Sequence, residues 1–339
     1  MTRTRRVLVC SSALALLIVL SSSVAPAGAA DPASTAAAEA AVAWLKTKQQ
    51  PDGGFEQTAF AGFETTDAVV AIAEGAQTGN TWNTAEARAA VEALKAGGSG
   101  PTPLDYLQTL IANASDPAVA AKNAVYVSRA LGIDPTAFGS LNLVDKMGGC
   151  NGSSTLGFNG LLYLTLAQAI LCGTAPSANV ATIRNAQQEN GGWNFAGDAT
   201  GTDIDSDSTA AAVEALVASG ATFDDSVVRK AIAFFADNQQ PDGAWQSFGE
   251  DDPNSTAMAV LGITAAGFDV TSSCWRDTVD PTAAGTGYAD PVAWLRAQQL
   301  TTGTDVGRIQ SPSDSFGVNT FATSQSVEGL LRSWLPVAR

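Results

Sequence analysis

Hydrophobic residues recur along this chain with a helical period, and short polar segments separate the apolar stretches. Residues 37–50 place Val42, Trp44 and Leu45 towards one face, which predicts an amphipathic helix. A polar loop follows, and residues 68–76 then form a more apolar stretch. The same alternation continues to the C-terminus, so the pattern predicts an all-α chain of helical hairpins.

The sequence predicts about six such hairpins, each with a mixed first helix and a more apolar second helix. The predicted pairs are 37–50 with 68–76, 104–112 with a helix opening at 116–117, 143–146 with 158–171, 180–188 with 209–219, 225–240 with 255–266, and 291–299 with 323–335; a further helix covers 85–96. Hairpins of this kind bury their apolar faces by stacking on their neighbours. An open solenoid and a closed ring both satisfy this need, and six pairs suit a closed double ring with the second helices inside.

A short motif, Gln-x-x-x-Gly-x-Trp/Phe, marks the end of several first helices. It occurs at 49–55, 187–193 and 239–245, and a broken copy starts at Gln298. The glutamine can bond free backbone groups at the helix end, the glycine permits a tight turn, and the ring packs across the junction. These properties predict a structural role at the outer seams between neighbouring hairpins.

A threonine that we expect to cap the second helix follows each copy, within 208–213, 255–260 and 322–327. With this feature the repeats resemble the terpene cyclase/protein prenyltransferase α/α-toroid superfamily, whose signature is the QW motif. The resemblance implies an all-α fold, an α/α toroid of about six helical hairpins forming a single domain over residues 31–339. It leaves function open, because the superfamily includes squalene-hopene cyclases, prenyltransferase β subunits and the helical domain of cobalamin-binding proteins.

The first residues have the features of a secretory signal peptide. Arg3, Arg5 and Arg6 precede an apolar run at 7–20 that is too short to span a bilayer, and small residues at 27–29 suit cleavage. We therefore expect a signal peptide at 1–30 and an extracellular protein, released or associated with the cell wall. No other stretch is long and apolar enough to predict a membrane span.

Charge and residue usage exclude several classes of function. The formal net charge is -15, which argues against nucleic acid and anionic membranes as partners. The chain has no histidine, so histidine-based catalysis and the zinc site of protein prenyltransferases are not expected, and we predict neither a metal nor a bound cofactor. Cys150 and Cys172 flank one predicted helix and are the favoured disulfide, which leaves Cys274 as a free thiol.

One acidic stretch is a candidate catalytic site. Residues 205–210 read Asp-Ser-Asp-Ser-Thr-Ala, similar to the Asp-x-Asp-Asp-Thr-Ala motif of class II terpene cyclases. The resemblance implies that Asp207 is the acid that protonates an alkene or epoxide, with Asp205 as the first carboxylate and Ser208 in place of the third. Such an acid needs a pKa raised by burial. The alternative is a helix N-cap, because Asp, Ser and Thr all favour that position.

A ligand-binding site is the leading hypothesis, with a reduced cyclase acting through Asp207 as the alternative. In an α/α ring the inner-helix N-termini gather on one face, where polar side chains would rim a cavity with apolar walls. The expected rim residues, each also a possible cap, are Asp67, Asn123, Asn159, Thr209, Asn254, Thr256 and Gln325. The resemblance suggests a cobalamin-like or isoprenoid ligand and a partner chain that closes the cavity. A glycan-processing (α/α)6 enzyme is a third possibility, which requires opposed carboxylates and a tryptophan-lined cleft.

Overall fold

The structure, a computed structural model, describes residues 30–56, 64–77, 81–152, 156–279, 287–312, 314 and 319–334. The regular secondary structure of this part of the chain is nearly all helical. Its only strands are β1 (Gln246–Ser247) and β2 (Glu250–Asp251), which pair antiparallel. The expected signal peptide, 1–30, lies outside the described residues except for Ala30, and α1 begins directly after it, at Pro32.

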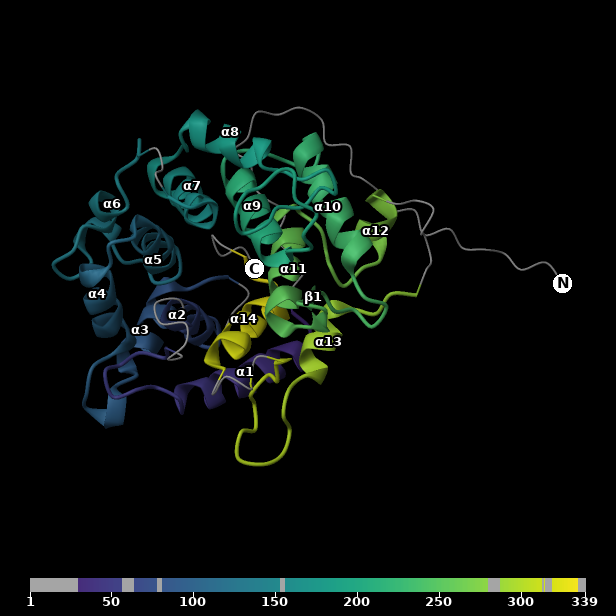
Figure 1. The fold of residues 1–339 in the computed structure, drawn as a ribbon. Helices are drawn as coiled ribbons and strands as arrows, with labels where there is room; N and C mark the ends of the chain where they lie inside the picture. The colour runs from purple at the N-terminus through teal and green to yellow at the C-terminus, as the bar shows by residue number, and fades with distance from the viewer. Residues whose placement is uncertain are drawn as a thin grey trace.

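The helices form two concentric layers (Figure 1). The outer helices are α1 (Pro32–Lys46), α4 (Pro103–Asn113), α6 (Leu143–Lys146), α8 (Ser177–Asn185), α10 (Ser226–Asn238) and α13 (Pro291–Ala297). The inner helices are α2 (Glu64–Glu74), α5 (Pro117–Arg129), α7 (Phe158–Cys172), α9 (Ser206–Ala218), α11 (Pro253–Ala265) and α14 (Thr320–Leu331). Additional helices are α3 (Thr84–Ala93) and α12 (Cys274–Val279), with 3-10 turns η1 (Ala96–Gly98) and η2 (Pro135–Ala137).

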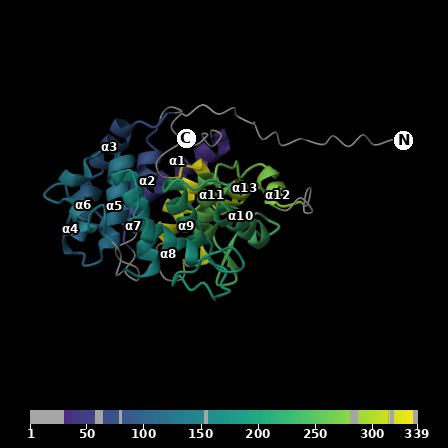
Figure 2. The ribbon, with the colours of Figure 1, turned by 90° about the horizontal axis from the view of Figure 1, so that it is seen from above.

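The ring is closed, as the sequence predicts. Each inner helix packs against the next, and α14 packs on α2, which joins the two ends of the chain. In the view turned by 90°, the two rings of helices lie at the same level, one inside the other (Figure 2). The inner helices are buried on nearly all sides, and every residue of α2 is buried. This explains why inner helices such as α7 and α11 carry apolar residues on all sides, whereas outer helices such as α10 need only one apolar face.

The repeated glycine lets each seam close tightly. Gly191 has a φ of +93°, and a Cβ there would collide with the carbonyl oxygen of Lys230 in the next outer helix. The equivalent glycines also approach the backbone of the following outer element: Gly53 meets Thr102 and Gly243 meets Ala289 just before α4 and α13, and Gly307 meets Ala40 within α1. The broken copy after Gln298 is therefore a true repeat that keeps its glycine.

The motif bonds backbone groups on both sides of the seam: Gln187 reaches the next outer helix, and the tryptophans bond the outer helix of their own hairpin. Gln187 donates from Nε2 to the carbonyl oxygens of Gly191 and Val227, both at 2.8 Å, and the second belongs to the next outer helix. Trp193 is fully buried and donates from Nε1 to the Ile183 carbonyl oxygen. The predicted structural role of the motif is confirmed.

The repeated threonines do not cap the inner helices, so that expectation was wrong. Asp205 caps α9, and Thr209 lies four residues later, inside the helix. The Thr209 hydroxyl donates to the Asp205 carbonyl oxygen at 2.7 Å and accepts from the Trp193 amide at 3.0 Å. Equivalent amide-to-hydroxyl bonds join Phe55 to Thr65, Trp245 to Thr256 and Ile309 to Thr323. The threonine thus fixes the motif against its own inner helix.

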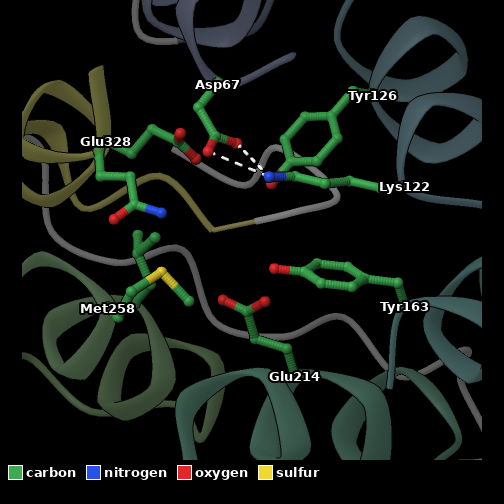
Figure 3. A pocket seen from close by; sticks show the side chains of 9 residues that line it. Asp67, Lys122, Tyr126, Tyr163, Glu214, Met258 and Glu328 are labelled. Carbon is green, nitrogen blue, oxygen red and sulfur yellow. Dashed lines mark hydrogen bonds and ion pairs between the residues drawn. The ribbon is translucent and has the colours of Figure 1, made fainter. Parts of the chain in front are cut away.

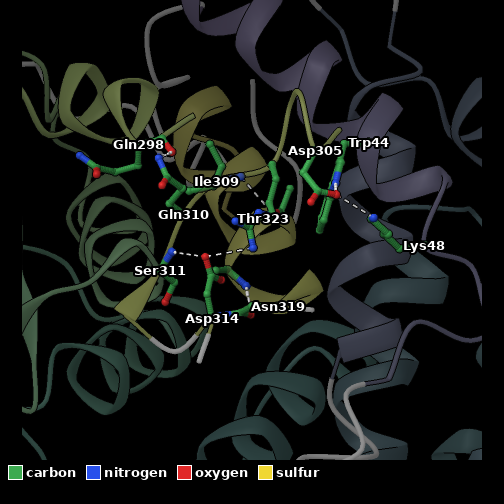
Figure 4. Close-up of polar contacts among 12 residues, drawn as sticks. Trp44, Lys48, Gln298, Asp305, Ile309, Gln310, Ser311, Asp314, Asn319 and Thr323 are labelled. Atoms are coloured by element: carbon green, nitrogen blue, oxygen red, sulfur yellow. Dashed lines mark hydrogen bonds and ion pairs between the residues drawn. The ribbon is translucent and has the colours of Figure 1, made fainter. Parts of the chain in front are cut away.

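The last repeat closes the ring on the first helix (Figure 4). Asp305 accepts from Trp44 Nε1 at 2.9 Å and pairs with Lys48 Nζ at 2.8 Å. Gln299 donates to the Ala37 carbonyl oxygen at 2.7 Å, as Gln187 does to that of Val227 in its next outer helix. The two ends of the chain are therefore joined by the same kind of seam as consecutive repeats.

Cys150 and Cys172 form the expected disulfide, which ties the end of α7 to the loop after α6. Cys274 is also disulfide-bonded, so the expectation of a free third thiol was wrong for the described cysteines. No helix in the described part of the chain is long and apolar enough to cross a membrane.

Candidate ligand site

A polar cavity lies at the centre of the ring (Figure 3). All six inner helices contribute to it. Its lining residues are Asp67 from α2, Lys122 and Tyr126 from α5, Tyr163 from α7, Glu214 from α9, Met258 and Leu261 from α11, and Gln325 and Glu328 from α14. Although the surrounding core is apolar, four of these residues have side chains that are charged at neutral pH in water: Asp67, Lys122, Glu214 and Glu328.

A buried ion pair spans the cavity. Lys122 Nζ lies 2.8 Å and 3.0 Å from the two carboxyl oxygens of Asp67, and both side chains are almost fully buried. The ammonium also lies 5.8 Å from the ring centre of Tyr126 and 5.4 Å from that of Tyr163. Burial by itself would lower the pKa of Lys122, but Asp67 outweighs burial and raises that pKa. Burial raises the pKa of Asp67, and Lys122 opposes that effect.

Two further carboxyls point into the cavity without such a partner (Figure 3). Glu214 is 8% exposed and Glu328 is 3% exposed, and neither side chain has a hydrogen bond or ion pair with any described residue. Burial is the main cause that raises the pKa of Glu214 to about 8. Burial, with the charges of Asp67 and Glu74, raises the pKa of Glu328 well above its usual range. Glu214 is therefore mostly protonated at neutral pH and can donate a hydrogen bond, and burial favours the same protonated form of Glu328.

The cavity itself is small. Its free volume of about 10 Å³ is about what one water molecule needs. Tyr163 and Met258 are partly exposed on inner helices that are otherwise buried, which places their exposed surface on the cavity side. The space at the centre thus accepts a small polar group, and any larger part of a ligand extends away from it.

Asp207 lies on the same helix as Glu214, two turns nearer the N-terminal end. The spacing of seven residues corresponds to about 10 Å along α9. The Asp207 side chain is solvent accessible, yet the protein around it reduces its solvation, and this desolvation is the main cause that raises its pKa to about 7. The charges of Asp205 and Asp252 raise the pKa further, whereas a hydrogen bond from Ser255 lowers it. We call the N-terminal end of α9, where Asp207 lies, the mouth.

Asp205, the other acid of the cyclase-like motif, has a structural function in this chain. Its carboxylate accepts from the Ser208 amide at 2.8 Å and from the Ser208 hydroxyl at 2.7 Å, and so caps α9. Ser208, which stands where the motif has its third carboxylate, therefore hydrogen-bonds the first carboxylate, that of Asp205. Of the two carboxyls of this motif, only that of Asp207 is not used to cap a helix.

The predicted rim residues divide into three groups. Asp67 and Gln325 line the cavity, and Asn254 donates to Gln325 at 3.0 Å from the neighbouring inner helix. Asn123 bonds Thr66 between α2 and α5, and Asn159 is partly exposed in the first turn of α7. Thr209 and Thr256 are fully buried with their hydroxyls in the seams, so their predicted place at the rim was wrong.

Sequence reasoning missed most of the cavity. The missed polar residues are Lys122, Tyr126, Tyr163, Glu214 and Glu328. The sequence did contain a signal for two of them. Beyond the first turn of α9 and of α14, the only charged residues are Glu214 and Glu328. A charge in the middle of a helix that is buried all round must face an internal cavity or a partner.

The fold, the QW-like seams and the central hollow agree with the comparison to known families. The prenyltransferase α/α toroid domain matches residues 2–96 and 157–286. The chain belongs to this family. No curated protein matches this sequence.

Several solved structures share the fold of this family member. The type II terpene cyclase MstE from Scytonema, without ligand, superposes with a TM-score of 0.58 at 14% identity, covering 88% of this chain and 97% of the cyclase. A variant of MstE in complex with geranylgeranyl dihydroxybenzoate, its substrate, gives a TM-score of 0.58 at 13% identity, covering 88% and 96%. A variant of MstE in complex with its product, merosterolic acid A, superposes with a TM-score of 0.57 at 14% identity, covering 88% of this chain and 96% of the cyclase.

Proposed function

We propose that the protein binds a small molecule of isoprenoid type in the hollow of its ring, with the polar end of the ligand in the central cavity. The proposal rests chiefly on one observation, the polar cavity to which all six inner helices contribute. An apolar core would stabilise a closed ring better than buried ionisable groups, which cost free energy unless they are fully paired. Buried ionisable groups with shifted pKa values in a cavity are typical of a functional site.

The family supports the isoprenoid part of the proposal. MstE, which shares this fold, has been crystallised with a geranylgeranyl-bearing substrate. Cobalamin fits the cavity poorly, because a free volume of about 10 Å³ accepts only a small group, so a corrinoid would have to rest at the mouth. None of the tryptophans lines the cavity, which gives the glycan-processing alternative no support. A partner chain over the mouth stays a prediction, as does secretion, with which the Cys150–Cys172 disulfide is consistent.

Isothermal titration calorimetry with geraniol, geranylgeraniol and cobalamin tests the proposal. Calorimetry is preferable to tryptophan fluorescence, because no tryptophan contacts the cavity. We expect saturable binding of the isoprenoid alcohols, and loss of that binding in Met258→Trp, which fills the cavity. Val306→Trp places the same side chain at an exposed site and is the control. Binding that is absent in the wild type, or that persists unchanged in Met258→Trp, contradicts the proposal.

A second candidate function, proton donation by Asp207, is favoured by the position and pKa of that carboxyl. It lies at the mouth with a pKa of about 7, and it matches the acid of the cyclase motif. An alkene or epoxide bound with its reactive end at the mouth would receive the proton. Against a cyclase, the Lys122 ammonium occupies the centre of the hollow, where it would repel a carbocation.

Product analysis by mass spectrometry after incubation with squalene, its epoxide and geranylgeraniol separates the two functions. A cyclase would form product that disappears in Asp207→Asn and persists in Asp203→Asn, an exposed acid four residues away. Its rate would fall as the pH rises through about 7, because the acid must be protonated. Binding without product supports the leading proposal, and product that survives in Asp207→Asn excludes this acid.

A further inference from the structure

The carboxyl groups around the central cavity outnumber its cations. Asp67, Glu214 and Glu328 face a single ammonium, that of Lys122. Lys122 bonds both carboxyl oxygens of Asp67, which leaves the other two carboxyls without a hydrogen bond or ion pair among the described residues. Both are more than nine-tenths buried, and both point into the cavity (Figure 3). Two carboxyls of the cavity therefore have no cation among its lining residues to pair with when they ionise.

The geometry points to an organic cation as the missing group: we propose that the cavity binds the ammonium end of an amine-bearing isoprenoid, which pairs with Glu214 and Glu328. This proposal rests on the proposed function and specifies the head group of its ligand. The hydrocarbon part would extend from the cavity along α9 towards the mouth, where Asp207 lies.

Lys122 demonstrates that the cavity accommodates an ammonium group. Its Nζ lies among a carboxylate and the faces of two tyrosines, and aromatic faces attract cations. Glu214 enters the same cavity from α9, on the side of Tyr163 away from Asp67 (Figure 3). Glu328 lies beside Asp67, opposite Glu214 (Figure 3), so a ligand ammonium between the two glutamates would meet the ring of Tyr163 and two carboxyls, an environment like that of Lys122.

Size and charge both suit this head group. The free volume of about 10 Å³ is about that of one water molecule, which an ammonium group resembles in size. The net charge of -15 also attracts cations and repels carboxylates from solution. A neutral alcohol would take hydrogen bonds from the protonated carboxyls, but it would form no ion pair with them.

Proton release gives the proposal a specific signature. At pH 6.5 the free cavity holds protonated Glu214, and a dissolved primary amine is already protonated. When the ammonium enters, Glu214 ionises to form the ion pair and its proton leaves to the buffer. About one proton is therefore released for each amine bound, whereas binding of an alcohol releases none.

The test compares three ligands with the same hydrocarbon tail: geranylamine, geraniol and geranic acid. Calorimetry at pH 6.5 in two buffers with different ionisation enthalpies measures affinity and proton release together. We expect geranylamine to bind about tenfold tighter than geraniol, since a charge-assisted hydrogen bond is stronger than a neutral one. Geranic acid should bind most weakly, and only the amine should release a proton.

Variants locate the effect. Glu214→Gln keeps the shape of the side chain and should lose both the preference for the amine and the proton release. Glu189→Gln makes the same change on an exposed residue and should keep both. Circular dichroism during thermal unfolding checks that each variant is folded.

The outcomes separate this inference from the proposed function. If no geranyl ligand binds, the proposed function fails and the inference with it. If geraniol binds as tightly as geranylamine, or if Glu214→Gln keeps the preference, the inference is wrong while the proposed function stands. Loss of the preference in Asp207→Asn instead of Glu214→Gln would place the amine at the mouth and overturn the proposal.

Discussion

The outer seams of the ring and the cavity at its centre follow opposite rules. In the seams the same glutamine, glycine, threonine and aromatic residue recur, and their polar groups bond to the backbone. In the cavity each inner helix contributes a different side chain, and two buried carboxyls have no partner among the described residues. Recurrence with satisfied hydrogen bonds identifies the residues that build the fold. Unique residues with unsatisfied charge identify the candidate site.

The largest expected effect comes from removing the cation of the cavity. Lys122→Met leaves Asp67 as a buried carboxyl without its counter-ion, and we expect the free energy of unfolding to fall by about 3–5 kcal/mol. The loss should be smaller at pH 5 than at pH 8, because protonation of the abandoned carboxyl relieves it. Urea unfolding at both pH values measures this. A loss that is independent of pH would contradict the ion pair.

The next effect tests a seam. In Gly191→Ala the Cβ meets the Lys230 carbonyl oxygen, and the left-handed backbone adds its own cost, for a loss of about 2–4 kcal/mol. Gly220→Ala is the matched control, since Gly220 also has a positive φ but its Cβ would meet no atom. The difference between the two unfolding free energies isolates the close approach. If the two variants lose equal unfolding free energy, the close approach of Gly191 to Lys230 does not contribute to the stability of the seam.

A smaller effect tests the hydrogen bond between the motif and the inner helix. Thr209→Val keeps the shape but leaves the buried Trp193 amide without its acceptor, which should cost about 1–3 kcal/mol. Thr182→Val, at an exposed site in α8, is the control. Neither seam variant should change ligand affinity in calorimetry once the protein is folded. If the Thr209→Val protein is as stable as the control, the Thr209 hydroxyl does not stabilise the seam.

The sequence predicts the ring well because its repeats carry local information. The glutamine and the glycine are needed wherever a seam forms, so both recur even in the broken copy, where Gly307 follows Gln299 by eight residues and Ile309 takes the place of the aromatic residue. The error over Thr209 has a physical cause. Threonine favours helix starts, but here Asp205 is the cap and the hydroxyl acts across a loop, a contact that helix signals alone do not predict.

The cavity is much harder to predict from sequence. Asp67 and Glu328 are neighbours only because α14 packs on α2 to close the ring. Side chains from six helices meet there once, with no repeat to give their register. Only the isolated charge in an apolar inner helix, as at Glu214, could have indicated where to look.

The most direct test of this account is the unfolding free energy of Glu214→Gln at pH 5 and pH 8, measured together with its affinity for geranylamine. The folded protein holds the Glu214 proton up to a pKa of about 8, while the unfolded chain loses it from its ordinary value of 4.5. Wild-type Glu214 therefore lowers stability increasingly as the pH rises between these values. After the cost of burying the amide, we expect the variant to gain about 1–2 kcal/mol at pH 8 and less at pH 5. A variant that is more stable yet binds geranylamine more weakly would confirm a carboxyl retained for its ligand. A variant that is less stable at pH 8 and binds equally well would contradict it.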